Sequence, residues 1–254
     1  MDSVYDLIIV GGGPAGLAAA YFLARGGVKV TVFEKEARMG GVVRNVIPGF
    51  RISDEAIDND VKIVAAMGVE MVNGKEITSI DELKKEYDYI VLAVGASDKG
   101  TLKLEAGDTM NALDFLAQFK ATDGKLDLGK NVVVIGGGNT AMDTARAAKR
   151  NAGVEKVSLV YRRTRRFMPA DEEELVMAME DGVEFAELLA PVKLEKQNPV
   201  LQEDGPGRHR RERTPRRSGD GRGRDRSGRH CYRSRGRERF RAHSMRNAAL
   251  PWTA

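Results

Sequence analysis

The first 200 residues of this 254-residue chain contain no cysteine and no histidine. The only cysteine and the three histidines all follow residue 200, at Cys231, His209, His230 and His243. The lack of cysteine excludes a disulfide framework, a Cys-x-x-Cys redox pair and a cysteine-ligated iron–sulfur cluster from residues 1–200. The lack of histidine excludes histidine catalysis there. We predict no catalytic side chain here and no metal site with cysteine or histidine ligands, and we assign no resident metal to the chain.

Long hydrophobic runs are also missing. No run reaches about 18 apolar residues, so we expect no membrane span. The Met1-Asp2-Ser3 start has no basic region ahead of an apolar core, so we expect no secretory signal. Together these absences predict a cytoplasmic protein. The length is compatible with one or two domains.

Charge is distributed very unevenly along the chain. Residues 201–254 contain 16 arginines and six acidic residues, a net charge of +10. Because the whole chain carries +4, residues 1–200 carry −6. This tail also contains no valine, isoleucine or lysine. The composition therefore changes abruptly at about residue 198.

The most informative pattern in the body is the stretch Asp6-Leu7-Ile8-Ile9-Val10-Gly11-Gly12-Gly13-Pro14-Ala15-Gly16. It reads as a buried strand, a Gly-x-Gly-x-x-Gly turn and the start of a helix that runs to Arg25. In this motif Gly11 allows the tight turn, Gly13 lets the backbone approach a pyrophosphate, and Gly16 lets the helix pack on the strand. A second strand, Val28 to Phe33, ends at Glu34, which can accept ribose hydroxyls. The pattern predicts a dinucleotide site rather than a glycine-rich surface turn.

The same pattern recurs 125 residues later, at Asn131-Val132-Val133-Val134-Ile135-Gly136-Gly137-Gly138-Asn139-Thr140-Ala141. Ala141 replaces the third glycine, an accepted variant of the turn. The next strand, Val157 to Tyr161, ends in Arg162 and Arg163 instead of an acid, with Arg165 and Arg166 close behind. Arginines suit a 2′-phosphate, although a solvated basic turn or a nucleic-acid contact is the alternative. The two motifs therefore predict FAD first and NADP(H) second.

Other segments are predicted from local patterns. Residues 39–44 read as a glycine-containing loop close to a ligand, and Ser53 as the cap of a helix to about Met67. We expect short strands at 69–72 and 76–80, a central strand at 89–96 that ends near the ligand, and a helix at about 111–119. The acidic run at 171–174 reads as the start of a helix to about Asp181, with a metal site as the alternative.

These motifs in this order resemble the two-nucleotide flavoproteins of the pyridine nucleotide-disulfide oxidoreductase type. The segments Gly40–Ile52, Gly136–Asp143, Tyr161–Arg163 and Met168-Pro169 are similar to the glutamate synthase small-subunit group, which includes the N-terminal half of dihydropyrimidine dehydrogenase. Within this group they are most similar to a flavoprotein subunit ascribed to selenate reductases. The resemblance implies that electrons pass from NADPH through FAD to an iron–sulfur or other partner subunit.

The motifs and the resemblance together give a set of candidate cofactor-binding residues. For FAD they are Gly11, Gly13, Pro14, Ala15, Gly16, Glu34, Lys35, Gly41, Val42, Arg44 and Gly95. For NADP(H) they are Gly136, Gly138, Asn139, Thr140, Ala141, Arg162 and Arg163. We expect an α/β fold with two Rossmann-like domains, an incomplete FAD domain at 1–97 and an incomplete NADP domain at 98–197. A thioredoxin-reductase-like flavoprotein is the rival enzyme, disfavoured by the missing cysteine pair.

The arginine-rich tail, residues 198–254, allows two interpretations. Segments rich in arginine, glycine and serine can bind nucleic acid. The alternative is a shifted reading frame, because the codons for residues 229–237, read one base downstream, permit Asp-Thr-Val-Ile-Ala-Ala-Val-Gly-Glu. In the flavoprotein group that this chain resembles, an apolar strand of this kind leads the chain from the NADPH domain back into the FAD domain. On this hypothesis the tail is disordered, the chain is a truncated product without activity, and nucleic-acid binding is not expected.

Overall fold

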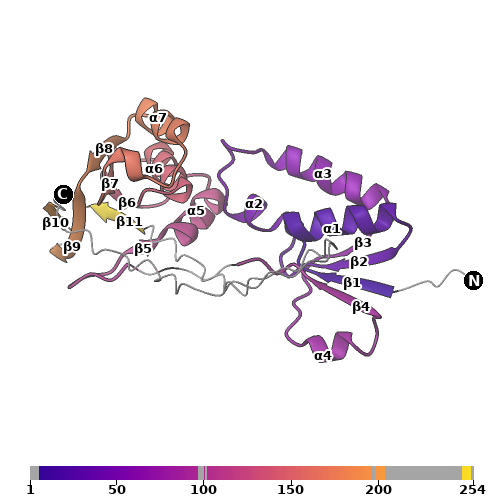
Figure 1. Ribbon diagram of the computed structural model, residues 1–254. Helices are drawn as coiled ribbons and strands as arrows, with labels where there is room; N and C mark the ends of the chain where they lie inside the picture. The colour runs from indigo at the N-terminus through magenta and orange to yellow at the C-terminus, as the bar shows by residue number, and fades with distance from the viewer. Residues whose placement is uncertain (1–5, 97–99, 101, 196–197, 204–247, 253–254) are drawn as a thin grey trace, which may run out of the picture.

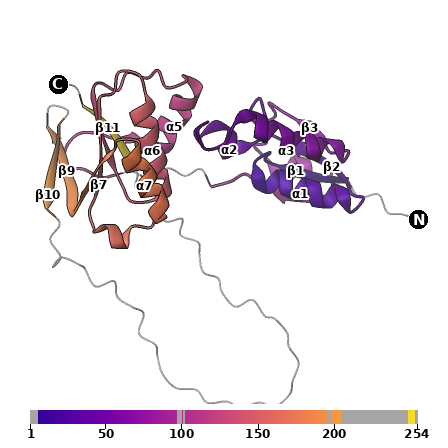
Figure 2. The same cartoon turned by 90° about the horizontal axis from the view of Figure 1, so that it is seen from above.

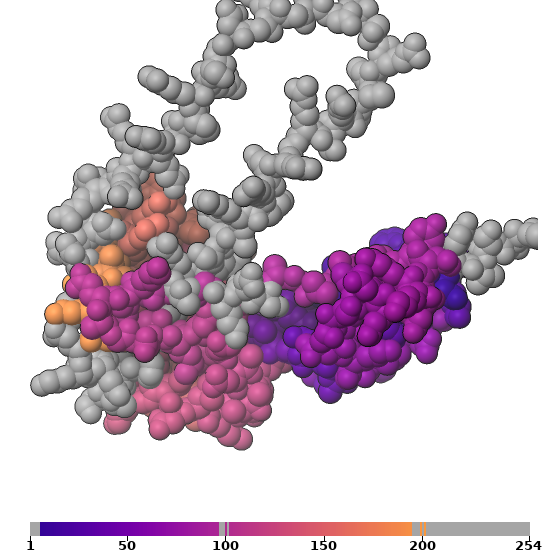
Figure 3. Space-filling view, turned by 90° about the horizontal axis from the view of Figure 1, so that it is seen from below, coloured from indigo at the N-terminus to yellow at the C-terminus, as the bar shows by residue number. Residues whose placement is uncertain are grey.

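A computed structural model describes residues 6–96, 100, 102–195, 198–203 and 248–252 of the chain. Two α/β units follow one another, each built on its own sheet (Figure 1). In the space-filling view they form two lobes that meet (Figure 3). The predicted fold class, α/β with two Rossmann-like units, is confirmed.

The first unit is a four-stranded parallel sheet in the order β3-β2-β1-β4. Its elements are β1 (Asp6–Val10), α1 (Pro14–Arg25), β2 (Lys29–Phe33), α2 (Gly41–Asn45), α3 (Asp54–Ala66), β3 (Glu70–Val72), α4 (Ile80–Leu83) and β4 (Tyr89–Leu92). Helices α1 and α3 bury one face of the sheet, and Leu83 of α4 packs on the other. Ile8 and Ile9 are fully buried, and each such burial is worth about 1.5–3 kcal/mol.

Strands β1 and β2 end level with each other, because Val10 pairs with Phe33. The glycine turn after β1 and Glu34 after β2 therefore lie side by side at the same edge of the sheet. In Figure 1 this edge faces the second unit. The register of two strands thus places the parts of the first motif together.

The second unit has a five-stranded sheet in the order β5-β11-β6-β7-β8, in which β6, β7 and β8 are parallel. Its elements are β5 (Met110–Asn111), α5 (Ala112–Ala121), β6 (Asn131–Ile135), α6 (Asn139–Arg150), β7 (Lys156–Tyr161), the 3₁₀ helix η1 (Arg165–Phe167), α7 (Glu172–Glu180), β8 (Glu184–Glu187), β9 (Leu189–Glu195), β10 (Asn198–Glu203) and β11 (Ala248–Trp252). Helices α5, α6 and α7 cover one face. Leu194 and Leu201 of the β9–β10 hairpin pack on the other.

Three predicted elements differ from the structure. Residues 76–80 form no strand, since Ser79 instead caps α4, with its Oγ accepting from the Asp81 N–H at 3.3 Å. The strand expected at 89–96 ends at Leu92, and it lies at the sheet edge rather than in the centre. The loop expected at 39–44 contains the short helix α2. Apolar runs and glycines alone do not reveal which strand has a neighbour on both sides.

Two segments of the tail form strands that the sequence did not predict. Residues 198–203 pair with β9, and residues 248–252 lie antiparallel between β5 and β6. Ladder hydrogen bonds come from the backbone, so these pairings need no particular side chains. Residues 204–247, on which the frameshift and nucleic-acid interpretations depend, lie outside the described residues.

Candidate nucleotide-binding sites

Two of the longer helices, α1 and α6, have starts that leave room for an anion. Each follows a glycine turn, has no acidic residue in its first turn and lacks a side-chain cap. The start of α2 is also uncapped and free of acids, but this helix has only five residues. By contrast, α3, α4 and α5 are capped by Ser53, Ser79 and Asn111, and α7 begins with three glutamates. Unpaired N–H groups and the positive end of the helix dipole favour a phosphate at such a start. Both starts therefore fit a dinucleotide pyrophosphate.

The glycines of the first turn differ in how much space surrounds their backbone. Gly11 has a φ of +108°, and a Cβ there would overlap the Ala93 carbonyl. A Cβ on Gly16 would overlap the Gly11 carbonyl, so α1 packs as closely as its backbone allows. In front of Gly13 the nearest atom to a built Cβ is Gly41 Cα at 3.8 Å. Gly13 therefore faces only the backbone of Gly41, and no side chain covers this part of the turn.

Glu34 is a buried carboxylate beside this turn. Its side chain is 6% exposed. Oε2 accepts a hydrogen bond from the Gly12 N–H at 2.6 Å, and Oε1 accepts one from the Glu36 N–H at 2.9 Å. A carboxylate has about four lone-pair positions, so each oxygen can accept another donor. The site therefore holds Glu34 in place while leaving acceptors for ribose hydroxyls.

Among the remaining FAD candidates, some residues are exposed to solvent and one, Arg44, is buried and hydrogen-bonded to its own unit. Val42 is half exposed, Lys35 is exposed, and Gly95 has a φ of +78° with open space around it. Arg44 is buried: Nε donates to the Met39 carbonyl and Nη2 to Asp58 at 2.6 Å. Its Nη1 lies 3.3 Å from Asp54 but makes no hydrogen bond. Arg44 thus braces the first unit and keeps one unsatisfied donor.

The second glycine turn repeats this arrangement. Gly136 has a φ of +150°, and its N–H bonds the Val160 carbonyl at 3.0 Å. A Cβ on Gly137 would meet the Tyr161 ring at 2.5 Å, whereas a Cβ on Gly138 would have Pro169 at 4.0 Å as its nearest neighbour. Ala141, in place of the third glycine, is fully buried. The backbone at Gly138 is therefore open.

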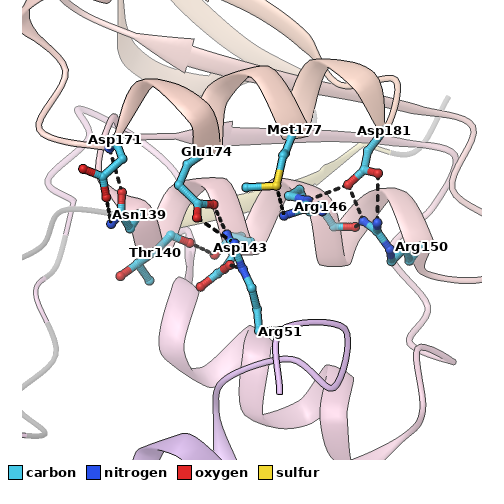
Figure 4. A network of polar contacts seen from close by, with 11 residues as sticks. Arg51, Asn139, Thr140, Asp143, Arg146, Arg150, Asp171, Glu174, Met177 and Asp181 are labelled. Carbon is cyan, nitrogen blue, oxygen red and sulfur yellow. Dashed lines mark hydrogen bonds and ion pairs between the residues drawn. The ribbon is translucent and has the colours of Figure 1, made fainter. Parts of the chain in front are cut away.

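Asn139 joins the starts of α6 and α7. Its Nδ2 donates to the Asp171 carboxylate, and its Oδ1 accepts from the Asp171 N–H, both at 3.1 Å. Figure 4 shows this pair at one end of the network between the two helices. The Thr140 carbonyl accepts from Thr144 Oγ1 at 2.7 Å. The side chain of Asn139 thus shapes the turn, and its backbone remains available to a phosphate.

The arginines after β7 fall into two groups. Arg165 donates from Nη2 to Glu172 at 2.9 Å, and its backbone N–H bonds Glu187. Among the described residues, no hydrogen bond or ion pair engages the side chains of Arg162, Arg163 or Arg166. Three guanidinium groups without a partner among the described residues therefore follow β7, where the second motif predicts a 2′-phosphate.

A cavity of about 600 Å³ lies beside these arginines. Arg166, Met168 and Asp171 are among the residues that line it, whereas Arg162 and Arg163 are not. Its volume is in the range that small-molecule ligands occupy. Arg166 is thus a candidate missing from the predicted site residues, although the sequence places it in the same basic run.

Comparison with known proteins decides the family. The model of the pyridine nucleotide-disulphide oxidoreductase family matches residues 5–205. The chain belongs to this family. The expected family and its dependence on FAD and NAD(P)H are therefore confirmed at the level of the family.

Relatives of this oxidoreductase are much longer than the matched region. A protein named "Putative oxidoreductase YgfK" from Escherichia coli (strain K12) is 49% identical over 199 residues, which cover 76% of this chain and 19% of that protein. The glutamate synthase (NADPH) small chain of the same strain is 37% identical over 203 residues, covering 74% of this chain and 43% of that protein. The chain thus spans less than half of either relative.

A solved structure shares the fold. FprA of Mycobacterium tuberculosis, in complex with NADPH, aligns with a TM-score of 0.65 at 20% identity, covering 80% of this chain and 66% of FprA. At this identity the likeness concerns the fold alone.

Among the described residues, no helix is both long and apolar enough to cross a membrane.

Proposed function

We propose that this chain carries the nucleotide sites of a flavoprotein electron-transfer subunit, which passes electrons from NADPH through FAD to an iron–sulfur or other partner subunit. The observation that carries the proposal is a contrast between two otherwise similar sites. Each has an uncapped, acid-free helix start after a glycine turn. The strand beside the first ends at the buried Glu34, and the strand beside the second ends at uncommitted arginines.

The first site is proposed to hold FAD. The start of α1 would hold the pyrophosphate, and Glu34 the ribose. When bound, FAD would accept a hydride from the nicotinamide, a reaction that protein side chains do not carry out. The proposed FAD contacts are Gly11, Gly13, Pro14, Ala15, Gly16, Glu34, Lys35, Gly41, Val42, Arg44 and Gly95. The role of the protein is to bind and orient the two nucleotides, so a catalytic acid–base pair is not required.

The second site is proposed to hold NADPH. The start of α6 would hold its pyrophosphate, and Arg162, Arg163 and Arg166 would hold the 2′-phosphate with charge-assisted hydrogen bonds. The other proposed contacts are Gly136, Gly138, Asn139, Thr140 and Ala141. Because NADH lacks the 2′-phosphate, these arginines would make the site selective for NADPH.

The partner, the location and the domain limits belong to the same proposal. The similarity to a protein named as a small chain favours assembly with another subunit. A cytoplasmic location and the division at about residues 97 and 197 remain predictions from the sequence.

Activity with an artificial acceptor tests the proposal. The purified full chain, supplied with FAD, is mixed with ferricyanide and either NADPH or NADH. We expect faster turnover with NADPH, with two ferricyanide ions reduced for each NADPH oxidised, since each ferricyanide accepts one electron. A chain that binds FAD and NADPH but does not oxidise NADPH would contradict the proposal. Failure to bind either would identify an inactive fragment, and salt-dependent RNA or DNA binding would favour the nucleic-acid alternative.

A further inference from the structure

One short stretch of chain, residues 40–51, contacts both nucleotide sites. We call it the linking segment. At its start, the Gly40 N–H donates to the Gly12 carbonyl of the first glycine turn at 2.8 Å. Gly41 packs so closely on Gly13 that a Cβ on Gly41 would lie 2.8 Å from Gly13 Cα. The segment therefore begins against the backbone proposed to hold the FAD pyrophosphate.

The other end of the linking segment binds the second unit through Arg51. Arg51 Nε donates to Asp143 on α6, and Nη1 donates to Glu174 on α7 at 2.7 Å. Nη2 bonds the second oxygen of Glu174. Figure 4 shows the guanidinium of Arg51 inserted between the two helices. The fork of an arginine against a carboxylate fixes orientation as well as distance.

Phe50 reinforces this contact. The guanidinium carbons of Arg146 and Arg150, both on α6, lie 5.1 and 4.4 Å from the centroid of its ring, within cation–π range. Asp181 holds both arginines with ion pairs of 2.6 Å. The ring of Phe50 also packs against the core of the second unit. Phe50 and Arg51, which are adjacent in the linking segment, thus contact α6 through apolar and ionic interactions.

The middle of the segment is fixed as well. Lys120 of α5 donates to the Ile47 carbonyl at 3.1 Å, and Val46 packs against the core of the second unit. Helices α2 and α5 lie side by side at this junction in both ribbon views (Figures 1 and 2). The path from the first glycine turn to α6 is therefore held along its length.

We infer that Arg51 is a positioning residue that sets the separation and orientation of the two nucleotide sites through the linking segment. Asp143 lies one helical turn after Asn139, so the contact of Arg51 is made close to the start of α6. Hydride transfer requires the donor and acceptor atoms in near contact, and a misplacement of 1 Å can cost about 100-fold in rate. The kinetic consequence rests on the proposed function, whereas the geometric role does not.

Variants of Arg51 separate positioning from binding. Arg51→Gln removes the charge, and Arg51→Lys keeps the charge but loses the fork. Lys29→Gln is the control, because Lys29 pairs with Asp6 at the starts of β2 and β1, within the first unit and away from the junction. In anaerobic stopped-flow with NADPH, we expect Arg51→Gln to slow flavin reduction at least about tenfold. Arg51→Lys should restore part of the rate, and the Kd values of FAD and NADPH should change less than about threefold.

A distance measurement on the full chain tests the geometry without turnover. Spin labels are placed at Asn59→Cys on α3 and Glu180→Cys on α7, in a Cys231→Ser background. We expect a narrow distance distribution in the native background and with Lys29→Gln, and a broad or shifted one with Arg51→Gln. If the native chain fails to reduce flavin, the proposed function fails while this measurement still decides the role of Arg51. A distribution unchanged by Arg51→Gln, or a native rate of flavin reduction in that variant, would overturn the inference.

Discussion

At the scale of single residues, Glu34 is the group on which the first site depends most. Its carboxylate accepts two backbone N–H bonds, and replacing it by an amide puts a donor opposite one of them. We expect Glu34→Gln to weaken FAD binding by about 1–2 kcal/mol, or roughly tenfold in Kd. Flavin fluorescence titration measures the change. The control is Glu36→Gln, an exposed acid two residues away, and equal affinity in the two variants would contradict the role of Glu34.

The uncommitted arginines make a second prediction at this scale. Replacing Arg162, Arg163 and Arg166 by alanine removes the charge-assisted bonds expected to the 2′-phosphate. Each such bond is worth about 1.5–3 kcal/mol, so we expect NADPH affinity to fall by at least tenfold and NADH affinity to stay the same. Calorimetric titration with both nucleotides measures this. Lys156→Ala, at the opposite end of β7, should leave both affinities unchanged, and a parallel loss of both nucleotides would refute the assignment.

The position of a residue relative to a glycine motif could be read from the sequence, but distant contacts could not. Glu34 and Arg162 were identified because each directly follows the second strand of its motif. Arg51 bonds residues 92 and 123 positions away, and no local pattern encodes such a contact. The sequence therefore predicted the candidate binding residues, and the structure added the residue that joins the two sites.

At the scale of elements, Gly16 permits the close packing of α1 on β1. A methyl group there would overlap the Gly11 carbonyl, which is backbone and cannot rotate away. We expect Gly16→Ala to lower the free energy of unfolding by about 1–3 kcal/mol, although alanine favours helices. Gly49→Ala is the control, because no atom lies within 4 Å of a Cβ at that position. Urea denaturation followed by circular dichroism compares them, and equal stability would show that the turn can relax.

The contact between α6 and α7 should depend on pH through Asp181. Burial alone would raise the pKa of Asp181, but hydrogen bonds and charge from Arg150 and Arg146 outweigh it and hold the pKa below its usual range. The ionised carboxylate therefore contributes stability that is full above about pH 4 and is lost as the pH falls through the lowered pKa. We expect Asp181→Asn to cost about 1–2 kcal/mol at pH 7.

Denaturation at several pH values checks this dependence. The difference between Asp181→Asn and the native chain should shrink below about pH 4, as the native carboxylate becomes protonated. Asp60→Asn, an exposed acid on α3 without an ion pair among the described residues, should show no such difference. A cost of Asp181→Asn that stays constant with pH would exclude the ionic contribution.

Elements with strong local patterns were predicted well, and short or edge elements were not. The strands and helices of both glycine motifs agree with the structure because apolar runs, glycines and caps coincide there. Helix α2, strand β5 and the β9–β10 hairpin were missed, since they are short or determined by pairing with distant segments. Strand β4 was expected in the centre of the sheet, but no described strand lies beyond it.

At the scale of the whole molecule, the outer edge of β4 bears on the frameshift hypothesis. Among the described residues, no strand neighbours β4 on the side away from β1, so a further strand could pair along this edge. We propose that a shifted frame removed such a strand. The coding DNA for residues 229–237, read one base downstream, should encode Asp-Thr-Val-Ile-Ala-Ala-Val-Gly-Glu or a similar apolar strand. A downstream reading without an apolar strand would eliminate the proposal.

The central claim is that FAD and NADPH bind this one chain at separate sites, that the second site is selective for NADPH over NADH, and that electrons pass from NADPH to FAD. Anaerobic mixing of the FAD-loaded full chain with NADPH, followed at about 450 nm where oxidised flavin absorbs, tests it most directly. We predict that one equivalent of NADPH bleaches the flavin in a single phase and that NADH at the same concentration bleaches it far more slowly. A flavin that stays oxidised with NADPH bound, or that is bleached equally fast by both nucleotides, would contradict the claim.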